Sequence, residues 1–350
     1  RYVSSTCGVP CTKDEMPIHD VSNGGKECIT LDLKDPRGLQ LLHNMLAKAD
    51  VFLTGVRQGG LERLGLDYEA IKDRYPRLIY AHGTAYGRSG PLSSLPGLDA
   101  VAFFGINGRL TDNMLTPDGG ICPITGMGDF TTGGYLDIGI MAALYQREKT
   151  GRGDYVMTSM YGVGGWVSQN CAIGTQYYEP GPRSRWTQSP MGQAYRTKDG
   201  KYVQLFVNEY EKRWDAFCEA FGLQDLHDDP RYNTRTAVND PENCRRIVQR
   251  CIDSALLQTG DELLAKLRLG NIPACINGHF CDRYTLPEQI EHNLANGYFV
   301  APTYDGEEAS GRTIYVSQFP LYFGSQGVVN NYARCHALDE DREALLKEFS

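Results

Sequence analysis

The sequence contains no long run of apolar residues and no block of basic residues. Its longest apolar stretch, residues 138–145, is too short to cross a bilayer. The 350 residues carry a formal net charge of −8 at pH 7, which argues against non-specific binding to nucleic acid. The opening residues do not resemble a signal peptide, and no internal repeat occurs. We therefore expect a cytoplasmic protein that binds neither nucleic acid nor membrane.

Several motifs that would identify a cofactor or a nucleophile are also absent. The glycine-rich loops at 55–60 and 83–90 match neither the dinucleotide-binding nor the phosphate-binding pattern, so a nicotinamide enzyme is not indicated. The 11 cysteines include no CxxC pair, and we expect buried reduced thiols rather than zinc ligands. This spacing predicts no metal site. No Ser-His-Asp arrangement stands out either, so a serine nucleophile is not indicated.

Apolar periodicity in the first half of the chain predicts alternating strands and helices. Strands are expected at residues 28–33, 50–54, 77–81 and 155–157. A helix is expected to begin at Pro36, with Asp35 as its N-cap. This alternation is typical of a Rossmann-like α/β domain with a mainly parallel sheet.

A proline- and charge-rich stretch divides the chain into domains. Residues 1–178 are predicted to form the first part of a large α/β domain, and residues 179–195 a linker. Residues 196–285 are predicted to form a smaller α+β domain, after which residues 286–350 return to the large domain. Within the smaller domain a strand is expected at 201–207, and helices at 210–221, 243–257 and 261–269.

Asp129 lies in the most distinctive stretch, the glycine-rich segment 126–133 before a long apolar helix. An aspartate in this position commonly caps the helix by accepting the N–H of Thr131 or Thr132. The glycines also let a ligand approach closely, and a helix dipole lowers the pKa of a nearby carboxyl group. Such a carboxylate stays ionised and available as a nucleophile. Local spacing leaves both roles open for Asp129.

Cationic residues near the predicted sheet form a second group of candidates. Arg57 and Arg63 follow a buried strand, on the side where open α/β sheets bind ligands, and Lys26 is expected near the same edge. These cations suit phosphate groups, although single arginines in loops are commonly solvated surface groups. Lys149 and Gly151 have a simpler interpretation, the cation and the glycine that end a helix.

Taken together, these features resemble the class III CoA-transferases, the family of formyl-CoA transferase and carnitine CoA-transferase. The matching segments are residues 29–34, 49–65, 76–80, 86–91, 96–99, 128–129 and 142–153. Within the family the chain is most similar to the branch that acts on 2-hydroxy acids and their enoyl derivatives, such as the phenyllactate and 2-hydroxyisocaproate CoA-transferases. The resemblance implies a CoA-binding α/β domain and an interlocked homodimer.

The resemblance assigns the catalytic role to Asp129. It implies that this carboxylate attacks an acyl-CoA thioester to give a mixed anhydride, and that CoA reaches an acceptor carboxylic acid through an aspartyl-CoA thioester. Acyl-CoA is then a substrate, and no cofactor is tightly bound. By the same resemblance, the CoA-contacting positions are Lys26, Gly55, Val56, Arg63 and Leu64. The family usually has Asn-Phe where this chain has Gly55-Val56.

Two sets of alternatives stay open. The candidates for an apolar acyl pocket, which core packing explains equally, are Phe103, Phe104, Tyr161 and Trp166. The alternative functions are an α-methylacyl-CoA racemase, which has a histidine base where this chain has Leu98 before Asp99, and a non-catalytic acyl-CoA-binding paralogue.

Family members begin with a strand-helix-strand unit, and we expect that unit to precede Arg1.

Overall fold

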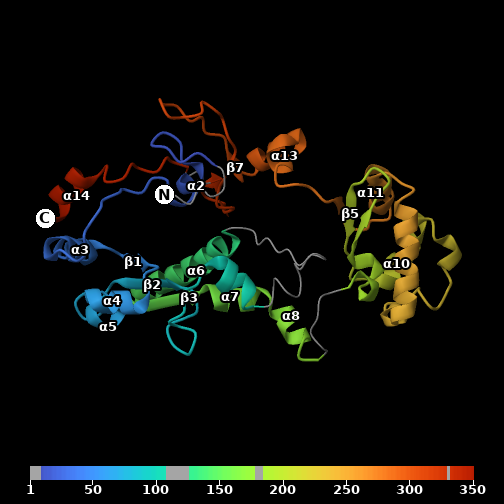
Figure 1. The fold of residues 1–350 in the computed structure, drawn as a ribbon, viewed down its shortest axis with the longest axis horizontal. Coiled ribbons are helices and arrows are strands. Elements are labelled where there is room, and N and C mark those ends of the chain that lie inside the picture. The colour runs from blue at the N-terminus through green and yellow to red at the C-terminus, as the bar shows by residue number, and fades with distance from the viewer. Residues whose placement is uncertain (1–8, 108–125, 178–183, 329–331) are drawn as a thin grey trace. The chain divides into compact units, whose positions relative to one another are not determined.

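The computed structural model describes residues 9–107, 126–177, 184–328 and 332–350 (Figure 1). The described chain forms two compact units. The first contains residues 9–107, 126–177 and those from 281 onward, and the second contains residues 184–280. Within these ranges no helix is both long and apolar enough to cross a membrane.

A parallel three-stranded sheet lies at the centre of the first unit (Figure 1). Its strands, in spatial order, are β1 (Val51–Thr54), β2 (Ile79–Thr84) and β3 (Tyr155–Ser159). Val51 lies opposite Ile79, and Tyr80 lies opposite Tyr155. The helices between these strands are α4 (Gln58–Leu64), α5 (Tyr68–Ile71), the π-helix η1 (Ala100–Gly105) and α6 (Met127–Thr150). The mixed α/β fold with a parallel sheet is therefore confirmed.

Alternating residues of the strands face the two layers that cover the sheet. On one face Tyr80 is buried with Leu61 of α4 and Ile71 of α5. On the other face α6 packs along β2 and β3. This packing is so close at Gly139 that a side-chain carbon there would lie 2.5 Å from Cγ1 of Val156. The close contact at Gly139 therefore fixes the position of α6 against β3 at this point.

Two local predictions about the first helix and strand differ in outcome. Helix α3 (Pro36–Lys48) begins as expected, because the Asp35 side chain accepts the N–H of Arg37 at 2.9 Å. The strand predicted at 28–33 is wrong, because these residues join no sheet. Carboxylates from the distant end of the chain bind this segment instead. Cys28 N–H donates to Asp341 at 2.6 Å, and Thr30 N–H donates to Asp339 at 2.7 Å.

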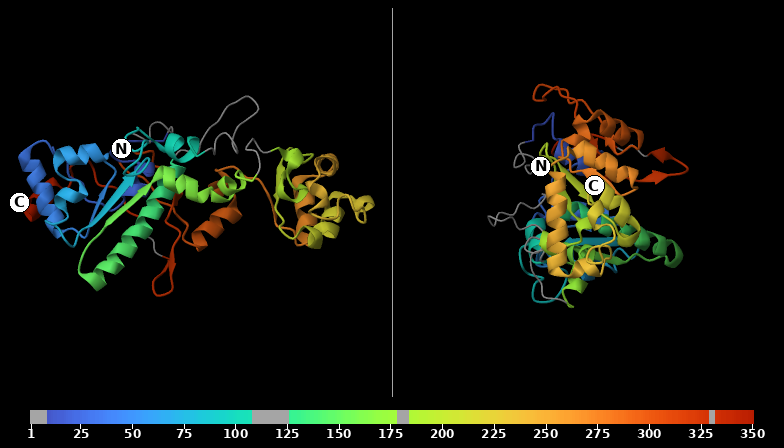
Figure 2. Two further views of the ribbon diagram at one scale, coloured as in Figure 1. Left: turned by 90° about the horizontal axis from the view of Figure 1, so that it is seen from below. Right: turned by 90° about the vertical axis from the view of Figure 1, so that its right-hand side faces the viewer.

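The remaining elements of the first unit either follow β3 directly or lie toward the two ends of the chain. They are α2 (Pro17–Asn23), α7 (Met160–Val167), α8 (Gln169–Gly174), α12 (Asp282–Thr285), α13 (Pro287–Ala295) and α14 (Arg342–Phe349), with the antiparallel pairs β7 (Phe299–Val300) with β8 (Val316–Ser317) and β9 (Tyr322–Phe323) with β10 (Gly327–Val328). Buried Asp20 of α2 accepts the hydroxyl of Tyr304 at 2.6 Å and the N–H of Cys335 at 2.9 Å. These bonds join α2 to the later segments, which the blue and red ribbons of Figure 2 also show close together.

The second unit is an antiparallel sheet with helices packed against it. Strand β5 (Tyr202–Leu205) lies between β4 (Ala194–Arg196) and β6 (Ala274–Ile276). Its helices are α9 (Tyr210–Phe221), α10 (Pro241–Ala255) and α11 (Gly260–Leu269), with the 3-10 turns η3 (Arg185–Thr187), η4 (Pro190–Gly192), η5 (Gln224–Leu226) and η6 (Ala237–Asn239). The helices predicted at 210–221, 243–257 and 261–269 are confirmed within two residues at each end.

Arg147, near the end of α6, binds the edge of the sheet where the strands begin. Its guanidinium donates to the carbonyl oxygen of Arg77 at 3.2 Å and to the side chain of Asp50 at 2.8 Å. These two residues precede β2 and β1 by only a few positions. The Arg147 side chain is 9% exposed, so its hydrogen bonds are largely shielded from water.

We expect Arg147→Ala to lower the free energy of unfolding by about 1–3 kcal/mol, because it leaves the carbonyl oxygen of Arg77 without this donor. Arg152→Ala is the matched control, since Arg152 lies just beyond the helix on an exposed position. Urea denaturation monitored by circular dichroism measures both variants. Equal midpoints for the two would contradict the role assigned to Arg147.

Candidate functional site

The carboxyl ends of β1 and β2 open onto a cavity of about 360 Å³. Its walls come from residues within segments 55–58, 82–88 and 93–97, and from Met160. The first turns of α6 add Asp129, Thr132, Gly133 and Leu136. In open α/β sheets this edge is where ligands commonly bind. The cavity therefore combines a carboxylate, loop cations and apolar side chains.

Asp129 is the third residue of α6 and not its cap. The helix begins at Met127, and Gly126 occupies the N-cap position with a φ of 80°. Glycine adopts this left-handed conformation readily, so the helix begins three residues earlier than an Asp129 cap requires. Among the described residues no side chain makes a capping bond at this end, so of the two roles left open by local spacing the cap is excluded. The Asp129 side chain instead lines the cavity, which shields it in part from water.

Gly128 allows the start of α6 to approach η1. A side-chain carbon at Gly128 would lie 2.8 Å from Cβ of Asp99 and 2.8 Å from Cβ of Phe103. Phe103 is fully buried, so it has no free space into which it can move. This close packing fixes the position of the residue that follows, Asp129.

Asp99 also binds the start of α6 by hydrogen bonds. Its carboxylate accepts the N–H of Ala100 at 2.6 Å and the N–H of Gly126 at 2.7 Å. One side chain thus connects the beginnings of η1 and α6. No local pattern predicts this role of Asp99, because Gly126 lies 27 residues away along the chain.

The pKa of Asp129 is raised above its ordinary value. Partial burial is the main cause, and the negative charge of Asp99 is the second. The helix dipole alone would have lowered it. The expectation of a lowered pKa is therefore wrong, because no capping hydrogen bond from the described residues compensates for the lost hydration of Asp129.

His82, in the second half of β2, holds part of the cavity wall. Its Nε2 lies 2.9 Å from the carbonyl oxygen of Val56, and its Nδ1 lies 3.1 Å from the hydroxyl of Tyr155. A carbonyl can only accept, so Nε2 carries the proton and Nδ1 accepts from Tyr155. Burial lowers the pKa of His82, which favours this neutral form. Neither partner of His82 could be identified from the sequence, because both are remote along the chain.

The structure brings together only some of the predicted CoA-contacting residues. Gly55 and Val56 line the cavity beside Asp129. Arg63 and Leu64 lie on α4 outside its lining, and Leu64 packs against the core beneath that helix. Lys26 lies just after α2, where its Nζ donates to the carbonyl oxygen of Ser22 at 2.6 Å. Contact of these five residues with CoA stays a prediction.

None of the aromatic candidates for the acyl pocket lines this cavity. Phe103 and Phe104 are buried in η1, which agrees with the alternative of core packing. Tyr161 and Trp166 lie on α7 and are exposed. The apolar part of the cavity wall comes instead from Val56, Ala85, Leu95, Leu136 and Met160.

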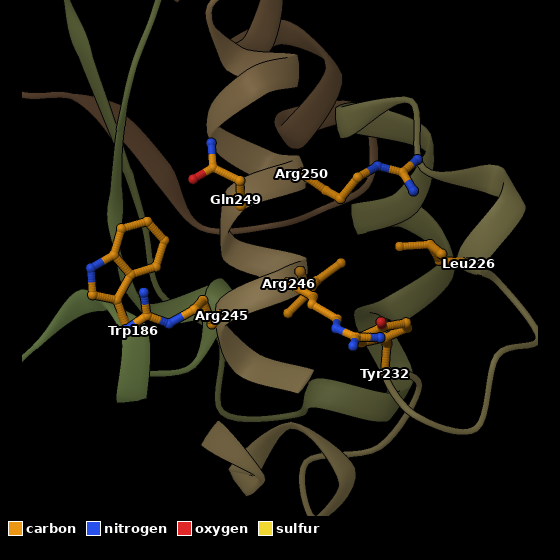
Figure 3. A pocket seen from close by; sticks show the side chains of 8 residues that line it. Trp186, Leu226, Tyr232, Arg245, Arg246, Gln249 and Arg250 are labelled. Atoms are coloured by element: carbon orange, nitrogen blue, oxygen red, sulfur yellow. The ribbon is translucent and has the colours of Figure 1, made fainter. Parts of the chain in front are cut away.

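A second cavity, of about 550 Å³, lies within the second unit beside α10 (Figure 3). Three arginines line it, but each guanidinium already contacts an acidic or aromatic side chain. Arg250 pairs with Asp225 at 2.8 Å, Arg246 pairs with Glu242, and Arg245 lies over the ring of Trp186. No carboxylate, histidine or thiol is among its described lining residues. This cavity therefore offers no group suited to nucleophilic chemistry.

Comparison with known proteins gives one family. The model of CoA-transferase family III matches residues 1–320. The cinnamoyl-CoA:phenyllactate CoA-transferase of Clostridium sporogenes is 32% identical, over 99% of this chain and 83% of that protein. The (R)-2-hydroxy-4-methylpentanoate CoA-transferase of Clostridioides difficile is 32% identical, over 94% of this chain and 80% of that protein.

The fold is also similar to that of a solved structure. The crystal structure of Rv3272 from Mycobacterium tuberculosis superposes with a TM-score of 0.78 at 28% identity. The superposition covers 93% of this chain and 84% of that one. The agreement thus extends over both units and is not limited to the sheet.

We expect Gly128→Ala to lower the free energy of unfolding by about 1–3 kcal/mol, because the added carbon meets the roots of two packed side chains. Gly134→Ala is the matched control on the same helix, where a Cβ meets no atom within 4 Å. That change should raise stability by about 0.5–1 kcal/mol, since alanine favours helix. Denaturant titration measures both, and a stable Gly128→Ala variant would contradict the packing argument.

Asp129→Asn should make the fold slightly more stable at neutral pH, with a melting temperature higher by about 2 °C at most. A carboxyl whose pKa is raised in the folded state favours folding while protonated, and loses that contribution as the pH rises through its folded pKa. The gain should therefore vanish in acid, where Asp129 is protonated. Thermal melts across pH measure it, with Asp137→Asn on the same helix as control.

Proposed function

This chain belongs to CoA-transferase family III, and we propose that it moves coenzyme A from an acyl-CoA to a carboxylic acid through Asp129. The observation that supports this role is the position of Asp129 in the cavity wall. It is the only acidic group among the described residues that line the cavity. A carboxylate suits the reaction because its anhydride with an acyl group preserves the acyl-transfer potential of a thioester.

In the first half of the proposed reaction, an Oδ of Asp129 attacks the thioester carbonyl of the donor. The new C–O bond forms as the C–S bond breaks, which gives a mixed anhydride and the CoA thiolate. The thiolate then attacks the carbonyl carbon of Asp129. The C–O bond to that carbon breaks, the donor acid leaves as a carboxylate, and an aspartyl-CoA thioester remains.

In the second half, the acceptor carboxylate attacks the aspartyl-CoA thioester and releases the CoA thiolate again. The thiolate then attacks the acceptor carbonyl of the new anhydride, which yields the product acyl-CoA and frees Asp129. Each step passes through an oxyanion that backbone N–H groups stabilise well. The first turn of α6, which carries Asp129 as its third residue, directs N–H groups toward the end of the helix where this chemistry takes place.

Other features of the cavity support the same proposal. Gly133 lies in its wall and faces open space, so a bulky substrate can reach the helix backbone there. Arg57 and Arg88 lie in the same wall, where they can attract a substrate that carries phosphate or carboxylate. The apolar side chains of the wall exclude water, which the anhydride requires in order to survive.

For the acyl group, we propose a 2-hydroxy or enoyl acid with an aryl or branched side chain. The names of two relatives support this choice, because they specify phenyllactate and 2-hydroxy-4-methylpentanoate. Leu95, Leu136 and Met160 give the cavity an apolar wall of the kind that such side chains bind.

A racemase is disfavoured by the residues near the site. The position before Asp99, where a racemase has its histidine base, is occupied by Leu98. This leucine is 75% exposed and has no group that could remove a proton. The histidine that does line the cavity, His82, already donates to Val56 from Nε2. Racemisation needs a group that removes a proton from the carbon beside the thioester, and His82 is not arranged for that task.

We also propose a Rossmann-like large domain that binds CoA and an interlocked homodimer in the cytoplasm. The exposed surface of α6 supports the proposal of a dimer. Four apolar residues on it are each 61–67% exposed, namely Phe130, Ile138, Met141 and Tyr145. Exposed apolar groups of this size along one helix commonly mark an interface. For CoA we propose contacts from Gly55 and Val56 in the cavity, with Lys26, Arg63 and Leu64 further along the bound molecule.

The proposal is tested by incubating the protein with cinnamoyl-CoA and phenyllactate, and following the formation of phenyllactyl-CoA by mass spectrometry. We expect Asp129→Ala to reduce transfer by at least about a thousandfold, since the covalent route is lost. Hydroxylamine added with cinnamoyl-CoA should convert Asp129 of the wild type to a hydroxamate. The Asp129→Ala variant should show no such adduct.

Asp137→Ala is the control, because it removes an exposed carboxylate from the same helix outside the cavity. Undiminished transfer by Asp129→Ala would exclude the covalent mechanism. Binding of acyl-CoA without turnover by the wild type, over a panel of acceptor acids, would identify a non-catalytic paralogue instead.

A further inference from the structure

Asp99 connects two elements that are separate in the sequence and meet at the site. One of its oxygens accepts the N–H of Ala100, at the start of η1, and the other accepts the N–H of Gly126, the N-cap of α6. The distances are 2.6 and 2.7 Å, and hydrogen bonds to a charged acceptor are stronger than neutral ones. Asp129 follows only three residues after Gly126, within the first turn of the helix.

The loop that carries Asp99 has little freedom to move. A side-chain carbon at Gly97 would lie 2.6 Å from Cβ of Ala85 and 2.8 Å from a ring carbon of Tyr86. On the other side, Asp99 itself lies against Gly128, as described above. Asp99 is thus held between the loop after β2 and the start of α6, and its hydrogen bonds transmit that position to the helix.

Asp99 is not among the residues that line the cavity, whereas Asp129 is. Its charge nevertheless acts on Asp129, whose pKa is raised first by partial burial and then by Asp99. The other charged or titratable groups in the cavity wall are Arg57, Arg88 and His82. Asp99 is therefore the negative neighbour of Asp129, and a more basic carboxylate is a stronger nucleophile.

We propose that Asp99 is the positioning residue of Asp129, which it holds in place through Gly126 and to which it presents a fixed negative charge. This inference rests on the proposed function, because it assumes that Asp129 is the nucleophile. It adds a second residue to that site, one that acts through another residue and never contacts the substrate.

The test compares Asp99→Asn, Asp99→Glu and the control Asp137→Asn. Asparagine removes the charge and keeps at most one acceptor for the two N–H groups. Glutamate keeps the charge and displaces the carboxylate by one methylene group. Asp137→Asn removes a charge from α6 at an exposed position away from the cavity. Stopped-flow kinetics with cinnamoyl-CoA as donor give kcat and KM from acidic to neutral pH.

For Asp99→Asn we expect kcat to fall by about 10- to 100-fold, because small misplacements of a nucleophile have effects of this size. KM for the donor should stay unchanged, since Asp99 lies outside the cavity lining. The acid limb of the kcat/KM profile should move to lower pH, because one cause of the raised pKa of Asp129 is gone. Asp99→Glu should keep the acid limb near that of the wild type while kcat falls.

Three results would overturn the role of Asp99. They are an Asp99→Asn profile that matches the Asp137→Asn control, a lower kcat with an unmoved acid limb, or loss of the folded circular dichroism spectrum in Asp99→Asn. The last would mean that Asp99 supports the fold in general. Transfer that survives Asp129→Ala would refute the proposed function itself, so the two failures are distinguishable.

Discussion

The close contact between the start of α6 and η1 is the constraint on which the site depends. Gly128 has no side chain, and the space that a Cβ would occupy is filled by Asp99 and Phe103. Since Phe103 is fully buried, the helix cannot rotate or slide at this point without disturbing the core. The next residue, Asp129, therefore reaches the cavity by steric necessity and not by a hydrogen bond of its own.

The parallel sheet adds the rest of the geometry. Because β1 and β2 run in the same direction, the loops after both strands meet at one edge, and Gly55 and Arg88 line one cavity although they are distant in sequence. Arg147 fixes the opposite end of α6 to residues that precede the strands. A single helix is thus held at the cavity end by close packing and at the far end by a shielded cation.

Much of the fold could be predicted because its signals are local. The cap of α3 by Asp35, the end of α6 at Gly151 and the apolar face of α10 each depend on residues within a few positions of one another. The strand expected at 28–33 failed because its alternation is genuine but its partners are carboxylates more than 300 residues away.

The candidate site was predicted less completely for the same reason. Asp129 stands out through its glycines, whereas the roles of Asp99 and His82 exist only through contacts made by the folded chain.

Exclusion of the capping role supports the assignment of Asp129 as the nucleophile. The oxygens of a capping carboxylate accept hydrogen bonds from backbone N–H groups, and those bonds stabilise the ionised ground state. Such a group would have to lose them in order to attack a thioester. In α6 the N-cap position is held by Gly126, and the bonds that organise this end go to Asp99. Within the part of the chain that the structure describes, the oxygens of Asp129 accept no capping bond, while partial burial and a neighbouring negative charge raise its pKa. One carboxylate, Asp99, therefore positions this end of the helix, and another, Asp129, reacts. The nucleophile is thus fixed in place although few hydrogen bonds stabilise its ionised form.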